Sequence, residues 1–271
     1  MTVRPLFSAR NEKTIIGMVH CAPLLGTVGY EGDMEKVIRR AVLDAQRLEQ
    51  GGITAILIEN HSDQPVGQYL SFEQTCAFSA LVQAVSEQVT VPFGVATSFC
   101  DYKSAIAIAA ATGASFIRCP VFTDTVVTVC GIIQPCAYDL IRYRKQLNAD
   151  HIAVLADIQV KYSHMVVPGI SIEESAVSAM MSGADAVIVT GTHTGGKTPT
   201  EEVQSVKRCV QIPVLIGSGF CEETVDEQLS VADGAIVGSA CKEDGVTDNP
   251  VSRERVLTLM GKVNRRWACR P

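Results

Sequence analysis

The sequence predicts a single-domain (β/α)8 barrel, the TIM-barrel form of the α/β class. Short runs rich in β-branched residues alternate with longer amphipathic runs, which is typical of a parallel sheet covered by helices. The alternation repeats eight times over 271 residues, close to the roughly 250 residues usual for such barrels, and 47% of the residues are hydrophobic. An open doubly wound sheet would alternate in the same way, but the eight repeats and the lack of a glycine fingerprint after the first run favour the barrel.

Eight apolar runs are expected to be the barrel strands, namely residues 14–20, 53–59, 91–97, 115–119, 152–158, 186–190, 212–216 and 234–237. The helices expected between them cover residues 33–51, 71–88, 101–112, 135–147, 171–182, 200–210, 222–230 and 252–267. Ser71, Ser171 and Thr200 supply side-chain oxygens where helices are expected to begin, and Glu or Gln follows each of them closely. No linker divides the chain, so residues 1–271 are interpreted as one domain with residues 1–13 as an N-terminal extension.

The composition argues against several functional classes. The formal charge is -6 and the basic residues are scattered, so no surface suited to nucleic acid is expected. No window approaches about 18 uninterrupted apolar residues, and the first 13 residues lack the apolar core of a secretory signal, which indicates a cytoplasmic protein without a transmembrane segment. The 10 cysteines stand singly without a CxxC pair, which favours reduced thiols over a structural zinc site.

Glycine- and serine-rich turns follow the last two expected strands. Gly217, Ser218 and Gly219 come after the seventh strand, and Gly238 and Ser239 come after the eighth. Small residues let backbone N–H groups approach an anion closely, serine hydroxyls donate further hydrogen bonds, and barrels commonly bind phosphate at these two positions. We therefore expect a phosphate-binding cup here; the alternative is that the glycines only make tight turns.

Further polar residues lie just beyond the other strands, at the end of the barrel where active sites form. Four histidines follow the first, second, fifth and sixth strands, and at least one is expected to bind substrate or transfer protons: His20, His61, His164 and His193. Glu59 and Asn60 end the second strand, where the carboxylate is a candidate base unless the loop is simply solvated. Arg118 ends the fourth strand and is expected to clamp an anionic group, and Thr192 is a donor in the loop after the sixth.

The fifth strand and the loop after it carry a carboxylate and an amine close together. Alternation with a period of two directs Asp157, Gln159 and Lys161 to the same side of the chain. If that side is the barrel mouth, Asp157 and Lys161 can transfer protons, and a desolvated Lys161 can form a Schiff base with a carbonyl substrate. The alternative is a structural ion pair inside the barrel.

These considerations give two sets of candidate residues. The candidate catalytic residues are Glu59, Asp157, Lys161, His164 and His193. The candidate substrate- and phosphate-binding residues are His20, Asn60, Arg118, Thr192, Gly217, Ser218, Gly219, Gly238 and Ser239. No metal site or cofactor is expected, because the first strand ends in Met18-Val19-His20 rather than in a His-x-His pair. A divalent metal remains an alternative, as does FMN, whose phosphate is held by similar loops in other barrels.

Several stretches, in their order and spacing, resemble the BtpA/SgcQ family of barrel proteins over nearly the whole chain. They are residues 16–24 (IGMVHCAPL), 59–60 (EN), 107–118 (AIAAATGASFIR), 155–157 (LAD), 160–161 (VK), 189–191 (VTG), 214–219 (VLIGSG) and 232–239 (ADGAIVGS). The resemblance implies a phosphate-binding-type barrel, and the family is known chiefly as uncharacterised enzymes and through a cyanobacterial role in photosystem I accumulation. Residues 97–101 and Cys119-Pro120 stand where Asn is common in the family, and Gln159 stands where His is expected, so altered specificity or lost activity is an alternative.

The leading hypothesis is an enzyme, a lyase, isomerase or hydrolase, that acts on a small phosphorylated metabolite such as a sugar phosphate or a nucleotide-like compound. The expected cup accounts for the phosphate, and the titratable residues around it account for acid–base chemistry. The rival hypothesis is a non-catalytic assembly or stability factor, which the photosynthetic role of the family suggests. The Ala- and Met-rich helices would also support a homo-oligomer.

Overall fold

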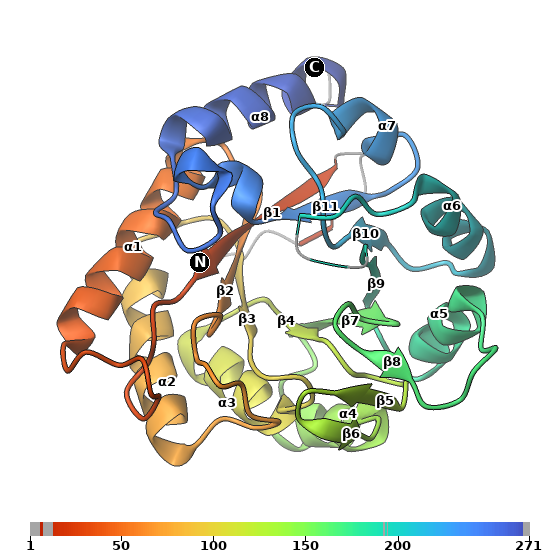
Figure 1. The fold of residues 1–271 in the computed structure, drawn as a ribbon, viewed down its shortest axis with the longest axis horizontal. Coiled ribbons are helices and arrows are strands. Elements are labelled where there is room, and N and C mark those ends of the chain that lie inside the picture. Colours follow the sequence, from red (N-terminus) through yellow and green to blue (C-terminus); the bar gives the residue numbers. More distant parts are fainter. Residues whose placement is uncertain (1–5, 8–12, 192, 194, 268–271) are drawn as a thin grey trace.

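The computed structural model describes residues 6–7, 13–191, 193 and 195–267, and its centre is a closed parallel barrel (Figure 1). Around the barrel the strands follow the order β1-β11-β10-β9-β7-β4-β3-β2. Their bounds are β1 Thr14–His20, β2 Ala55–Glu59, β3 Phe93–Ala96, β4 Phe116–Cys119, β7 Ala153–Ile158, β9 Ala186–Val189, β10 Val214–Ile216 and β11 Gly234–Val237. The predicted TIM barrel is therefore confirmed, and each strand lies within two residues of its expected bounds.

Helices surround the barrel and connect successive strands (Figure 1). They are α1 Met34–Gln50, α2 Phe72–Ser86, α3 Tyr102–Thr112, α4 Ala137–Gln146, α5 Ile172–Met181, α6 Thr200–Cys209, α7 Val225–Leu229 and α8 Arg253–Trp267, with two short 3-10 turns, η1 Ser239–Cys241 and η2 Glu243–Gly245. Ser71 and Ser171 form the capping boxes that begin α2 and α5, as their positions predicted. The start signal at Thr200 was wrong by one residue, because Pro199 is the N-cap of α6 and the Thr200 hydroxyl contacts Glu227 instead.

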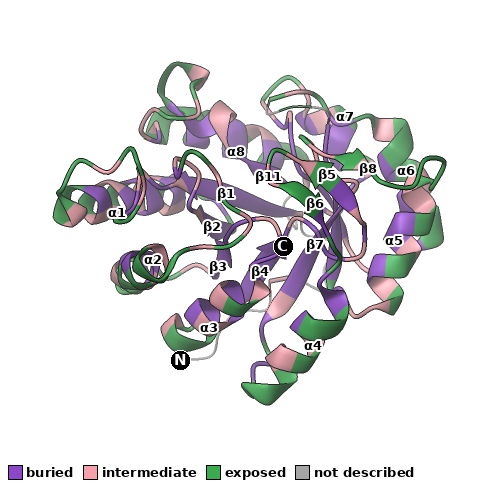
Figure 2. Ribbon diagram, turned by 60° about the horizontal axis from the view of Figure 1, so that its bottom comes forward, coloured by how far each residue is buried: buried purple, intermediate pink, exposed green. Residues whose placement is uncertain are grey.

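Buried residues lie on the barrel strands and on parts of the surrounding helices (Figure 2), and the apolar ones form two layers. The first layer fills the barrel, and its largest members are Ile16, Met18, Leu57, Phe116, Leu155, Ile188, Leu215 and Ile236. The second layer lies between the strands and the helices. Gly94 makes room for the aromatic ring of Phe116, because a β-carbon at Gly94 would lie 2.3 Å from Cε2 of that ring. With its interior filled in this way, the barrel is a packed core rather than a channel.

A small antiparallel sheet, absent from the sequence prediction, is inserted after two of the barrel strands. It consists of β5 Val126–Thr128, β6 Gly131–Ile133 and β8 His164–Met165 in the order β6-β5-β8. Because β5 and β6 follow β4 while β8 follows β7, the sheet belongs to the connections at the carboxyl ends of the barrel strands. Among the helices that the structure describes, none combines the length and apolarity needed to cross a membrane.

Candidate functional site

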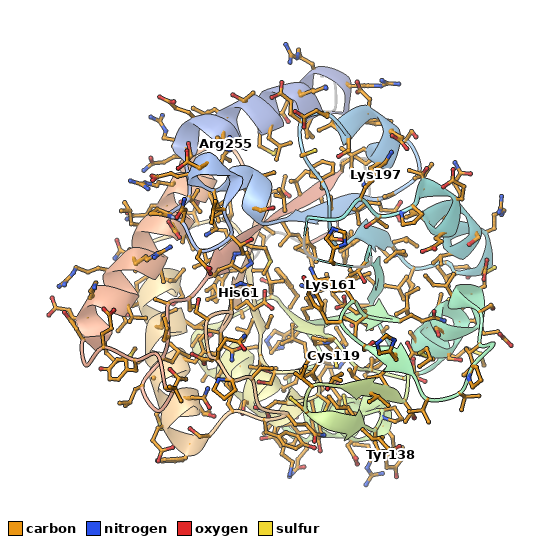
Figure 3. The ribbon with its side chains drawn as sticks, viewed as in Figure 1. His61, Cys119, Tyr138, Lys161, Lys197 and Arg255 are labelled. Carbon is orange, nitrogen blue, oxygen red and sulfur yellow. The ribbon has the colours of Figure 1, made fainter. Side chains whose placement is uncertain are left out.

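A cavity of about 400 Å³ lies at the carboxyl ends of the barrel strands, within the size range of small-molecule sites. Ten of the predicted site residues line it: His20, Glu59, Asn60, Arg118, Lys161, Gly217, Ser218, Gly219, Gly238 and Ser239. Figure 3 shows Lys161 and His61, another lining residue, in the central part of the molecule. Residues predicted from six different strand ends thus share one cavity, as the barrel rule requires.

Four predicted residues do not line this cavity. His164 is exposed, because it belongs to β8 and pairs with Val127 in the small outer sheet. His193 is also exposed, with its ring beside Gly196. Asp157 is buried beneath the cavity, and Thr192 lies outside the described residues.

The predicted alternation after β7 was wrong. The strand ends at Ile158, and Gln159 adopts a positive φ of 46°, which reverses the direction of the chain there. The side-chain amide of Gln159 consequently donates to the carbonyl of Ile170, just before α5, and to the hydroxyl of Ser175 within α5. Lys161 still lines the cavity, but it does so without Asp157 and Gln159 beside it on one face.

Asp157 pairs with Arg118 rather than with Lys161. Nε of Arg118 donates to Oδ2 of Asp157 and Nη2 donates to Oδ1, each over 2.8 Å, and both side chains are buried. Burial by itself would lower the pKa of Arg118, but the charge and hydrogen bonds of Asp157 outweigh it and raise that pKa. Two guanidinium hydrogen bonds are thereby fixed, while the remaining donors of Arg118 are available to a ligand in the cavity.

Lys161 is a half-buried amine with no ion pair to its Nζ among the described residues. Its position is fixed by the backbone, because its N–H donates to the Thr190 hydroxyl over 3.2 Å. Burial lowers the pKa of Lys161, the charge of Arg118 lowers it further, and the carboxylates of Glu59 and Asp157 act in the opposite direction. A lysine with a lowered pKa has more of the neutral amine that acts as a base or as a nucleophile.

His20, Glu59 and His61 form a cluster on the other side of the cavity. Nε2 of His20 lies 3.8 Å from Oε2 of Glu59, and the rings of His20 and His61 lie 4.4 Å apart between centroids. Burial lowers the pKa of His20 well below its usual value, and the neighbouring His61 lowers it further, so the ring is neutral. One ligand atom from each residue lies within 4.8 Å of the others, which makes this the one set of described residues with the spacing of a metal site. His61 was named with the four histidines at the strand ends but was left out of the two sets of candidate residues, although it comes directly after Glu59-Asn60.

The glycine-rich turns form one wall of the cavity. Gly219 has a φ of +66°, and a β-carbon there would lie 2.5 Å from the carbonyl oxygen of Gly196, so only glycine fits. The Ser218 hydroxyl accepts from the N–H of Gly191 and donates to the Gly196 carbonyl, so it holds the loop after β9. Within the described chain, the backbone N–H groups of Gly219 and Ser239 have no hydrogen-bond acceptor. This wall therefore offers backbone N–H groups to a ligand, whereas the Ser218 hydroxyl is already occupied by Gly191 and Gly196.

A buried ion pair behind this wall was missed by sequence reasoning. Nζ of Lys242, in the turn after β11, donates to Oδ2 of Asp44 in α1 over 3.2 Å, and both side chains are fully buried. Oδ1 of Asp44 accepts from the backbone N–H of Val251 over 2.7 Å. Asp44 thus fixes the segment after the β11 turn to the first helix. No pattern in the sequence marks this pair, because its members are 198 residues apart.

Comparison with known proteins gives one family and many structures of the same fold. The model of the BtpA family matches residues 11–265. An uncharacterized protein of Pyrococcus horikoshii is 38% identical over 92% of this chain and 95% of its own length. The photosystem I biogenesis protein BtpA of Synechocystis sp. is 32% identical over 93% of this chain and 88% of that protein.

The similar solved structures are barrels of much lower sequence identity. Thiamine phosphate pyrophosphorylase from Pyrococcus furiosus superposes with a TM-score of 0.59 at 16% identity, covering 95% of this chain and 98% of that one. Tryptophan synthase from Mycobacterium tuberculosis gives a TM-score of 0.63 at 17% identity, covering 97% and 95%. At these identities the likeness supports the barrel fold and nothing more specific.

Proposed function

Because the chain belongs to the BtpA family, we propose that it is an enzyme that binds a small phosphorylated metabolite and transforms it by acid–base chemistry of the lyase or isomerase type. One observation carries the proposal. The cavity that is walled on one side by the glycine-rich turns also contains Glu59 and Lys161. An anchor for an anion and two proton-transferring groups thus share a space of small-molecule size.

The phosphate is assigned to the turns after β10 and β11. The backbone N–H groups of Gly219 and Ser239 lack acceptors within the described chain, and a phosphate oxygen would satisfy them. Arg118 adds positive charge to the same cavity, and its guanidinium has donors beyond the two that bind Asp157 for which the described residues supply no acceptor. Two proteins of similar fold bear names with phosphorylated compounds, the thiamine phosphate pyrophosphorylase and an N-(5'-phosphoribosyl)anthranilate isomerase. Their names agree with this assignment.

The chemistry is assigned to Lys161 and Glu59. Lys161 has a lowered pKa and no ion pair among the described residues, which suits a base that removes a proton from the substrate. The Glu59 carboxylate lines the same cavity and is the second proton-transferring group. A Schiff-base lyase is the sharper variant, in which the neutral amine of Lys161 attacks a substrate carbonyl and water leaves. Borohydride trapping with candidate phosphorylated ketoses and aldoses would then leave a reduced covalent adduct at Lys161 that the Lys161→Met variant lacks.

The phosphate assignment is tested by thermal stability with inorganic phosphate and a panel of sugar phosphates. A ligand at a hundredfold excess over its Kd stabilises the folded state by about 2.7 kcal/mol, which is a measurable rise in Tm. Ser239→Asp places a negative charge on the wall of the cavity and should abolish that rise. Ser230→Asp is the matched control, because Ser230 is exposed and precedes β11, at the opposite end of the barrel. Equal stabilisation of both variants, or no stabilisation of the natural protein by any phosphorylated compound, would refute the assignment.

A second candidate function is a non-catalytic assembly factor, and the Synechocystis relative bears the name photosystem I biogenesis protein. Exposed apolar side chains on and beside the small outer sheet favour it, because such a patch suits a protein partner: Val127, Val129, Ile132, Val166 and Val167. The two functions separate in a complementation experiment. Loss of the cellular effect in Lys161→Met and Glu59→Gln supports an enzyme, whereas full complementation by both variants supports an assembly factor.

A further inference from the structure

The strand pairing of the barrel brings His20 and Glu59 together. They are register partners at the ends of the adjacent parallel strands β1 and β2. His61 follows Glu59 by two residues, and its ring lies against that of His20 at 4.4 Å between centroids. All three side chains line the cavity, and one ligand atom of each lies within 4.8 Å of the other two. The spacing of His20 and Glu59 is thus set by the pairing of two barrel strands.

The His20 ring is not satisfied by the protein atoms around it. Its Nδ1 is buried and has no hydrogen-bond partner within the described part of the chain. Its Nε2 is 3.8 Å from the Glu59 carboxylate, which is beyond hydrogen-bonding distance. Buried polar atoms of native proteins are almost always paired. An ion bound at Nε2 would give that nitrogen the partner it lacks, and Nδ1 would then carry the proton of the neutral ring.

We propose that His20, Glu59 and His61 bind one divalent transition-metal ion, with Zn²⁺ as the best match. Two imidazoles and one carboxylate are a ligand set for zinc and neighbouring transition metals, whereas Mg²⁺ and Ca²⁺ prefer oxygen ligands alone. In a tetrahedral zinc site with bonds of about 2.1 Å, the ligand atoms stand about 3.4 Å apart. The 3.8 Å between Nε2 of His20 and Oε2 of Glu59 is close to that spacing, and all three ligand atoms lie within 4.8 Å of one another, so binding would draw them slightly together.

The surroundings of the cluster fit a site that acts on a ligand rather than a structural one. Three protein ligands leave coordination positions open to the cavity, as in catalytic zinc sites. Oδ1 of Asp248 lies 3.9 Å from Nε2 of His61, so this carboxylate adds negative charge beside the ring without a hydrogen bond to it. Gly238 adjoins the cluster, since a β-carbon there would lie 2.9 Å from Cε1 of His20. An ion bound here would therefore stand next to the glycine-rich wall and, on the proposed function, would polarise an oxygen of the substrate held there, with Glu59 as a ligand and Lys161 as the remaining proton-transferring group.

The test is metal titration of the chelator-treated full-length protein, without any phosphorylated compound. Zn²⁺ is titrated in competition with a chromophoric chelator, and Co²⁺ binding is followed in the visible spectrum. We expect one ion per chain, a loss of affinity of roughly tenfold or more in Glu59→Gln and in His61→Ala, and no change in His151→Ala, which removes an exposed histidine far from the cluster. The cobalt protein should show the visible d–d bands of an ion with few ligands, without the additional absorption of sulfur-to-cobalt charge transfer.

Three results would overturn the proposal. They are the absence of a bound ion in the natural protein, unchanged affinity in Glu59→Gln and His61→Ala, and a thiolate charge-transfer band, which would assign the ion to cysteines. Circular dichroism and Tm identify any variant that fails to fold. If His61→Ala does not fold, Glu59→Gln still tests the site, because glutamine keeps the shape of the glutamate side chain. Because no phosphate is present, a failure here leaves the phosphate assignment standing, and a failure of phosphate binding leaves the metal result standing.

Discussion

Arg118 and Asp157 close the floor of the cavity with two parallel hydrogen bonds of 2.8 Å. They project from the neighbouring strands β4 and β7, where Arg118 is the register partner of Leu155. Arg118 lines the cavity, whereas Asp157 lies beneath it. Asp157 therefore serves as the residue that orients the guanidinium, and the direct contact with a ligand falls to Arg118.

The first prediction concerns this pair. Asp157→Ala should lower the free energy of unfolding by about 3–5 kcal/mol, because it leaves the buried Arg118 charge without a partner. The double variant Arg118→Met/Asp157→Leu should lose much less, since it removes both charges and leaves neither buried without a partner. Urea denaturation of the three proteins measures the difference. A double variant as unstable as Asp157→Ala would contradict the prediction.

The second prediction concerns the Ser218 hydroxyl. In Ser218→Ala the buried N–H of Gly191 loses its acceptor and the Gly196 carbonyl loses a donor, so the free energy of unfolding should fall by about 1–3 kcal/mol. The loop after β9 should also exchange its amide hydrogens faster and be cut sooner by protease. Ser205→Ala is the control, because its hydroxyl contacts the Glu202 carbonyl within α6 and the Glu173 carboxylate, and neither belongs to the loop after β9. If loop exchange is the same in both variants, Ser218 does not hold the loop.

The third prediction compares two glycine substitutions. The β-carbon of Gly238→Ala would lie 2.9 Å from the His20 ring, so we expect a loss of about 1–3 kcal/mol in unfolding free energy and weaker binding of both phosphate and Zn²⁺. Gly261→Ala in α8 meets no atom within 4 Å and should raise stability by about 0.5–1 kcal/mol, because alanine favours the helix. Denaturation and ligand-dependent Tm shifts test both variants. Normal ligand binding by Gly238→Ala would show that His20 tolerates the added methyl group.

The barrel and the general place of the site could be predicted because they depend on local patterns. Alternation of strand and helix fixed the topology, and the carboxyl ends of parallel strands meet at one end of a barrel, so Glu59, Lys161 and Gly219 were expected in one cavity. Which other side chains lie beside these residues could be predicted only in part. The positive φ of Gln159 broke the assumed alternation, and backbone reversals of this kind leave no periodic signal.

Pairings between distant segments were the other feature beyond sequence reasoning. Arg118 was expected to hold an anion and Asp157 to face Lys161, yet they bind each other across 39 residues. Lys242 and Asp44 are a still more distant example. Which strand neighbours which was predictable, but the choice of ion-pair partner depends on side-chain reach and desolvation inside the folded barrel. The two-residue strand of His164 was too short to give a pattern, and so its exposure was not foreseen.

The last prediction is that Lys161 reacts with an acylating reagent at lower pH than the exposed lysines do. Acylation requires the neutral amine, and burial, followed by the charge of Arg118, lowers the pKa of Lys161. A lowered pKa means that the neutral fraction grows at a lower pH, so the rate at Lys161 should reach half of its plateau before that of an exposed residue such as Lys103. Peptide mapping by mass spectrometry after short labelling at a series of pH values gives both curves from one sample.

The variant Arg118→Met/Asp157→Leu separates the two causes of this shift. It removes one charge that lowers the pKa of Lys161 and one that raises it, so burial remains as the dominant cause and the labelling midpoint should stay below that of Lys103. A midpoint that moves up to that of Lys103 in the double variant would assign the shift to charge instead of burial. Coincident curves in the natural protein would remove the physical basis for Lys161 as the base or nucleophile, because an ordinary lysine amine is almost fully protonated at neutral pH.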